Sequence, residues 1–95
     1  MMVQLRQWIS WQKYRQTVYV FNERTKRVYL FADTAKDFWT ALITNDSIPA
    51  VVSWLSTQYG ENLRDTIQTD LMRFISELED YGLIYSFEGY AHEQL

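Results

Sequence analysis

The hydrophobic pattern of the chain changes its period near residue 32, and this change most constrains the fold. Before it lie two runs rich in β-branched and aromatic residues, TVYVFN at residues 17–22 and RVYLF at 27–31, separated by the polar residues 23–26. Residues 8–14 alternate in the same way, more weakly. The pattern predicts a β-hairpin, with residues 8–14 as a third antiparallel strand.

After the change, apolar residues recur at spacings of three and four, which predicts an amphipathic helix. Asp33 or Thr34 can supply its N-cap, and the pattern ends near Thr44. The residues expected on its buried face are Ala35, Phe38, Trp39 and Leu42.

Two further helices are predicted. Ser47 can cap the second, Pro49 suits its first turn, and Gly60 fits the position just past its end. The third begins between residues 62 and 66 and ends at residues 81–82. Its apolar face is expected to hold Ile67, Leu71, Phe74, Ile75 and Leu78.

Strands followed by helices with short connections indicate an α+β fold, specifically a winged helix-turn-helix-like arrangement with a three-stranded antiparallel sheet followed by three helices. A chain of 95 residues supports a single domain. We expect its core to span residues 8–85, with residues 83–85 returning as a short extended segment and residues 86–95 forming a flexible tail.

The residue inventory argues against catalysis. There is no cysteine, and His92, the single histidine, falls in the predicted tail. The three glycines are scattered, so no phosphate-binding loop is formed, and the acidic residues 77, 79 and 80 read as a solvated helix face. We therefore predict no enzyme activity, no catalytic residue, no metal site and no cofactor. The apolar runs are too short to span a membrane, which predicts a cytoplasmic protein without a membrane partner.

Charge is unevenly distributed along the chain. Residues 1–36 carry a net charge of +5 and residues 37–95 one of −8, which sum to the overall −3. The segment 63–81, which would be the recognition helix of a DNA-binding winged helix, has a net charge of −3. Because DNA binding needs a basic surface that displaces counterions, no nucleic-acid partner is expected. The asymmetry is either a chance distribution or suits a partner with both acidic and basic groups.

The predicted hairpin is apolar on both faces. Strand alternation is expected to send Val18, Val20, Val28 and Leu30 to one side and Tyr19, Phe21, Tyr29 and Phe31 to the other. Since a solvent-facing sheet side is normally polar, something should cover the second side. The candidates are the protein's own aromatic residues at positions 8, 11, 85 and 87, or a bound peptide.

The segment 27–31 has none of the charges, prolines or bulges that usually protect a sheet edge. If it is the edge strand, an extended peptide could add to it as a further strand. The third helix could supply the opposite wall of the site. The predicted peptide-binding residues are Val28, Tyr29, Leu30, Phe31, Ile67, Leu71, Met72 and Ile75. The same edge could instead form a homodimer seam.

Residues 17–84 resemble the PqqD-like family, the recognition elements that bind precursors of ribosomally made, post-translationally modified peptides. The resembling segments are TVYVFNERTKRVYLF, DTAKDFW, SIPAVVSWLSTQYG and DLMRFISELEDYGLI. Two positions depart from the pattern: Lys26 stands where a turn glycine is common, and Ala32 where asparagine often precedes the first helix.

The resemblance implies that a leader peptide lies as an added strand between the third strand and the third helix. It also implies partners. The chain looks most like a stand-alone lasso-peptide protein that presents its precursor to a leader peptidase and a macrocyclase. The alternatives are a pyrroloquinoline quinone pathway chaperone serving a radical SAM enzyme, and a winged-helix DNA-binding protein.

Overall fold

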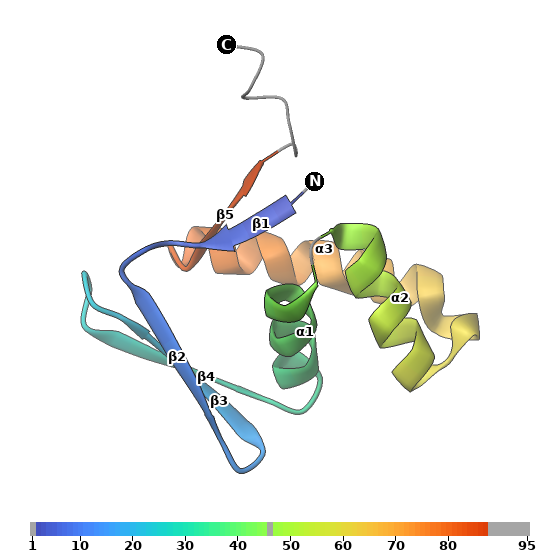
Figure 1. Cartoon of the computed structure of the whole chain (residues 1–95), viewed down its shortest axis with the longest axis horizontal. Helices are drawn as coiled ribbons and strands as arrows, with labels where there is room; N and C mark the ends of the chain where they lie inside the picture. The colour runs from blue at the N-terminus through green and yellow to red at the C-terminus, as the bar shows by residue number, and fades with distance from the viewer. Residues whose placement is uncertain (1, 46, 88–95) are drawn as a thin grey trace.

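A computed structural model describes residues 2–45 and 47–87. A three-stranded antiparallel sheet lies to one side of the helices (Figure 1). Its strands pair in the order β2 (Ile9–Tyr14), β3 (Thr17–Asn22) and β4 (Arg27–Ala32). The predicted hairpin and the more weakly indicated third strand are both confirmed.

Three α-helices follow the sheet, and their bounds match the predicted ones closely. They are α1 (Asp33–Thr44), α2 (Ile48–Tyr59) and α3 (Arg64–Asp80), with a short 3₁₀ turn at Glu61–Leu63 ahead of α3. The α+β fold predicted from the change of period is therefore confirmed.

The ends of α2 form as the sequence predicts. The Ser47 hydroxyl accepts a hydrogen bond from the Ala50 N–H at 3.3 Å, and Pro49 lies in the first turn, where its missing N–H costs nothing. At the other end, Gly60 has φ of +126°, a conformation that side chains rarely adopt, and its N–H donates to the Ser56 carbonyl at 2.8 Å.

The predicted N-cap of α1 is wrong. Ala32 holds the N-cap position, and no side chain makes a capping hydrogen bond. Because β4 runs directly into the helix, the chain turns at Asp33, which has φ of +53°. Aspartate tolerates this left-handed conformation better than most residues, so Asp33 is used for the turn and not for the cap.

A second, two-stranded sheet was not predicted in full. β1 (Met2–Leu5) pairs antiparallel with β5 (Ile84–Phe87), and the half-buried Val3 and Leu5 pack against the core. The extended segment expected after α3 is thus confirmed, but residues 86 and 87 belong to β5 and not to a flexible tail. The remainder of the predicted tail, residues 88–95 with His92, lies outside the described residues.

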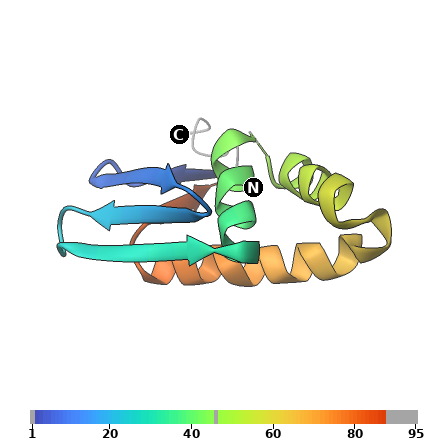
Figure 2. The ribbon, with the colours of Figure 1, turned by 90° about the horizontal axis from the view of Figure 1, so that it is seen from below.

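The core lies between the three-stranded sheet and the helices. Trp39 is fully buried, with its ring 5.5 Å from the ring of Phe31 and 6.1 Å from that of Trp11. Figure 2 shows α1 standing between the sheet and α2. β4, the edge strand of the sheet, reaches the region of α3 through ring contacts of its side chains with Phe74 and Tyr81.

The predicted assignment of the hairpin faces is wrong in its phase. Val18 pairs with Phe31 and Val20 with Tyr29, so these four side chains share the core face. The opposite face holds Tyr19 and Phe21 together with Val28 and Leu30. The alternation within each strand was predicted correctly. The register between the strands depends on the position of the turn, which places Asn22 opposite Arg27 and so decides which residues of the two strands share a face.

Candidate functional site

β4 is an edge strand, and its backbone pairs on one side only within the described part of the chain. The Glu23 N–H donates to the Trp8 carbonyl at 3.0 Å, which continues the β2–β3 register. Since antiparallel strands alternate hydrogen-bonded and non-bonded pairs, the intervening residues of β3, Val18 and Val20, direct their backbone groups toward β4.

This alternation identifies the free backbone groups of β4. Tyr29 and Phe31 are the partners of Val20 and Val18, so their N–H and C=O groups point to β3. The N–H and C=O groups of Val28 and Leu30 consequently point away from the sheet. We call these free groups the β4 edge. They have the spacing of two residues that an added strand requires.

The side chains of Tyr29 and Phe31 reach across to α3. Tyr29 stacks on Tyr81, with ring centroids 4.9 Å apart and 27° between the ring planes. Phe31 contacts Phe74 edge to face, with centroids 5.5 Å apart. We call these four residues the aromatic wall. Tyr81 is 45% exposed and Tyr29 and Phe74 are half-buried, whereas Phe31 is only 9% exposed, so the first three rings offer most of the aromatic surface beside the β4 edge.

Three of the four predicted α3 residues lie in the core. Ile67, Leu71 and Ile75 are 5%, 0% and 2% exposed, so they offer almost no surface to a ligand. Met72 is 39% exposed. It lies two residues before Phe74, however, and because two residues span more than half a helical turn, the Met72 side chain is on the opposite flank of α3. There it borders a shallow hollow with Asp65, Gln68 and Thr69.

The residues at the centre of the predicted apolar stripe of α3 are buried because that face packs into the core. Phe74 lies at the margin of this stripe and is half-buried, and Tyr81 follows the last residue of the helix. Their spacing of seven residues, two turns of helix, was the sequence signal that could have identified them.

Charged residues surround the β4 edge on both sides. Asp70 and Glu77 lie one turn before and after Phe74 on the same flank of α3, and both are exposed. Lys26 and Arg27 stand exposed at the start of β4. A peptide at this edge would therefore meet carboxylates on α3 and cations at the β3–β4 turn. The basic first part of the sequence and the acidic second part thus lie on opposite sides of the β4 edge.

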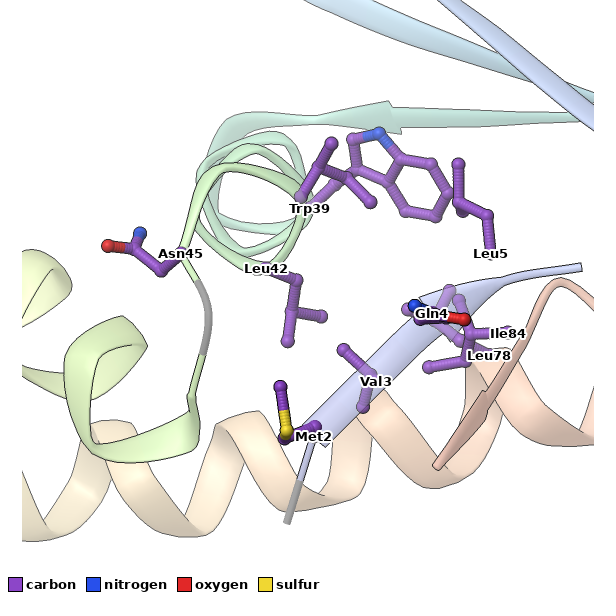
Figure 3. A pocket seen from close by; sticks show the side chains of 10 residues that line it. Met2, Val3, Gln4, Leu5, Trp39, Leu42, Asn45, Leu78 and Ile84 are labelled. Carbon is purple, nitrogen blue, oxygen red and sulfur yellow. The ribbon is translucent and has the colours of Figure 1, made fainter. Parts of the chain in front are cut away.

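A separate cavity of about 340 Å³ lies along β1. Figure 3 shows Leu42 and Trp39 of α1 on one side and Val3 and Met2 of β1 on the other. The rest of the lining is made by Leu5, Ile43, Leu78 and Ile84 together with the polar Gln4 and Asn45. Among residues 2–45 and 47–87, none makes a hydrogen bond with the buried indole nitrogen of Trp39. In Figure 3 this nitrogen lies on the side of the ring nearer the sheet, away from Met2.

The described residues near the β4 edge form no candidate metal site. Across residues 2–45 and 47–87, no cluster of three or more histidine, cysteine, aspartate or glutamate side chains could hold a metal ion. Tyr59 has a pKa raised to about 12 by its burial and by its hydrogen bond to Asp37, but this pair joins α2 to α1. None of the helices in the described ranges is long and apolar enough to cross a membrane.

Comparisons with known proteins agree with this architecture. None of the curated proteins matches the chain. Two solved structures share the fold. TbiB1 in complex with the TbiA(beta) leader peptide gives a TM-score of 0.80 at 15% identity, covering 90% of this chain and 98% of that one. A lasso peptide synthetase B1 complexed with the leader peptide gives 0.77 at 20% identity, covering 90% and 100%. The family model described as coenzyme PQQ synthesis protein D matches residues 17–84, and the chain therefore belongs to the PqqD family.

Proposed function

We propose that this protein binds the leader segment of a ribosomally made precursor peptide and presents it to modifying enzymes, without catalysing a reaction itself. The observation that carries this proposal is the β4 edge, with its free backbone groups at Val28 and Leu30. An added strand would gain main-chain hydrogen bonds there, each contributing about 0.5–1.5 kcal/mol.

The aromatic wall supports the same interpretation. Side chains of an added strand alternate, so every second one would pack over Tyr29, Phe31, Phe74 and Tyr81. The proposed site thus consists of residues 28–31 with Phe74 of α3 and Tyr81, the residue that follows this helix. The buried Ile67, Leu71 and Ile75 would support these residues from the core.

The comparisons support one pathway for this proposal. Both solved structures of similar fold are named as complexes with leader peptides, and one is named a lasso peptide synthetase B1. The proposal accordingly extends to lasso-peptide biosynthesis in the cytoplasm, with a leader peptidase and a macrocyclase as the proposed partners.

The test compares two proline substitutions on opposite sheet edges. Leu30→Pro removes an N–H from the β4 edge and leaves the β3–β4 ladder intact, because that N–H does not bond to β3. Lys13→Pro removes the equivalent N–H from the outer edge of β2 and is the matched control. Leu30→Thr keeps the N–H and controls for the lost side chain.

The probe is a synthetic peptide that spans the leader of the precursor encoded beside this protein, with affinity measured by fluorescence anisotropy. We expect Leu30→Pro to weaken binding by about tenfold or more, and Lys13→Pro and Leu30→Thr to change it by less than about threefold. Circular dichroism checks that each variant is folded. Equal affinity of the two folded proline variants would rule out strand addition at β4.

A further inference from the structure

Two arginines lie against aromatic rings where β1 passes into β2. The Arg24 guanidinium is 3.9 Å from the centroid of the Trp8 ring. The Arg6 guanidinium is 4.8 Å from the centroid of the Tyr85 ring and 5.8 Å from that of Trp8. We call these four residues the arginine corner. It borders a hollow of about 440 Å³, which is lined by Gln4, Leu5, Arg6, Gln7, Trp8 and Tyr85.

Neither guanidinium of the corner forms an ion pair within the described part of the chain. The ion pairs found there are made by Lys36, Arg64 and Arg73. Arg6 is half-buried and Arg24 is exposed. A guanidinium that lies on a ring keeps the N–H groups at its edge available, and these groups match the two oxygens of a carboxylate or phosphate. The corner therefore suits an anionic ligand.

The surroundings of the corner favour a singly charged anion. The Arg6 N–H donates to the Leu83 carbonyl at 3.0 Å, which places the corner beside the end of α3. That end carries the exposed carboxylates of Glu77, Glu79 and Asp80, and the C-terminus of a helix adds partial negative charge. A phosphate dianion or a nucleic-acid backbone would be repelled more strongly than one carboxylate. A carboxylate side chain also brings an aliphatic stem that can pack on the rings.

The corner lies at one end of the β4 edge. The Glu23 N–H donates to the Trp8 carbonyl, and Figure 1 shows the connection from β1 to β2 beside the β3–β4 turn that contains Arg24. Leu83 follows Tyr81 of the aromatic wall by two residues. Trp8 extends the β2 row, two strand spacings from β4, a span of about 10 Å that about three extended residues cover. A peptide leaving the β4 edge beside Tyr81 therefore needs only a few residues to reach the corner.

We propose that the arginine corner binds a carboxylate side chain of the precursor peptide, a few residues beyond the stretch that adds to β4. This inference rests on the proposed function and adds a chemical requirement to it: the precursor carries an aspartate or glutamate outside the added strand. It also gives a role to the net charge of +5 on residues 1–36, because that part of the chain supplies both guanidiniums and meets acidic groups of the ligand.

The test replaces single arginines. Arg24→Gln removes the exposed cation of the corner, and Arg6→Gln removes the half-buried one. The matched control is Arg15→Gln, because Arg15 is also exposed and its guanidinium lies 5.3 Å from the centroid of the exposed Tyr14 ring. Arg15 is at the β2–β3 turn, the opposite end of the sheet. Circular dichroism checks that each variant is folded, and the exposed Arg24 provides the test if Arg6→Gln does not fold.

Each protein is titrated with two synthetic leader peptides by fluorescence anisotropy. One has the natural sequence, and the other has asparagine and glutamine in place of each aspartate and glutamate. For the natural leader, we expect Arg24→Gln and Arg6→Gln each to weaken binding by about fivefold, and Arg15→Gln to change it by less than about twofold. The amide peptide should bind the unmodified chain about fivefold more weakly, and Arg24→Gln should weaken it no further, because the two losses are of one interaction.

Four results would overturn the inference. The first is an equal loss on Arg24→Gln for the natural and the amide peptide. The second is equal affinity of the Arg24 and Arg15 variants for the natural leader. The third is saturable binding of inorganic pyrophosphate that only the Arg6 and Arg24 variants lose, which would identify a phosphate ligand. The fourth is a natural leader without any acidic residue outside the stretch added to β4. Failure of the unmodified chain to bind either leader peptide would instead reject the proposed function.

Discussion

Tyr29 of β4 and Tyr81, the residue that follows α3, stack at 4.9 Å between ring centroids. The two residues are far apart in sequence, and their contact joins the free margin of the sheet to the end of the longest helix. With the Phe31–Phe74 contact, it sets the relation between β4 and α3 at both ends of the proposed site. The same rings therefore contribute to the stability of the fold and to the surface that a peptide would meet.

Replacing Tyr81 tests the value of this stack. Tyr81→Ala should lower the free energy of unfolding by about 1 kcal/mol, because stacked aromatic pairs contribute about 0.5–1.5 kcal/mol beyond their buried area. Tyr81→Phe keeps the ring and should stay close to the unmodified protein. Urea denaturation followed by tryptophan fluorescence measures both. Equal stability of the two variants would show that the stack contributes nothing.

The β3–β4 turn contains a residue in an unfavourable conformation. Lys26 has φ of +63°, and its N–H donates to the Asn22 carbonyl at 2.8 Å. Lys26→Gly should raise the free energy of unfolding by about 0.5–1 kcal/mol, because glycine adopts this conformation without a Cβ clash. Thr25→Gly should lower it, since Thr25 has a negative φ and its hydroxyl accepts a hydrogen bond from the Arg27 N–H. Thermal denaturation of both variants checks the opposite signs.

Ser56 offers a stabilising substitution in α2. Its side-chain oxygen is fully buried and has no hydrogen-bond partner. Ser56→Ala should raise the free energy of unfolding by about 1 kcal/mol, because an unsatisfied buried hydroxyl is removed and alanine is the better helix former. Ser53→Ala, at an exposed position of the same helix, should show only the smaller helix-propensity gain. Chemical denaturation compares the two gains, and a larger gain at Ser53 would contradict the assignment.

Tyr59 should make stability depend on pH in the alkaline range. Its pKa in the folded protein is raised from 10.0 to about 12, first by burial and then by its hydrogen bond to Asp37. Between these values the unfolded chain releases a proton that the folded chain keeps, so stability falls as pH rises from 10 toward 12. Tyr59→Phe should show a shallower fall over this range. Denaturation at successive pH values measures the slopes, and equal slopes would reject the raised pKa.

The local pattern was enough to predict the elements of the fold because its signals act within a few residues. Ser47, Pro49 and Gly60 bound α2 through capping and backbone preferences that need no distant partner. Periodicity likewise identified the strands and the buried stripe of α3. β4 is the edge strand that the sequence indicated. Of the residues predicted on α3 for the opposite wall, Ile67, Leu71 and Ile75 are buried, because an apolar stripe marks the face of the helix that packs into the core.

The sequence by itself determined where strands give way to helices, the ends of those helices and the family to which the chain belongs. Only the tertiary structure decided which side chains meet. The register between β3 and β4 depends on the turn, which sets Val18 opposite Phe31. Alternation along each strand does not determine this register. The β1–β5 pairing and the Tyr29–Tyr81 stack join residues distant in the chain. Such contacts are selected by the packing of the whole molecule, because no local pattern encodes which distant residue will be the partner.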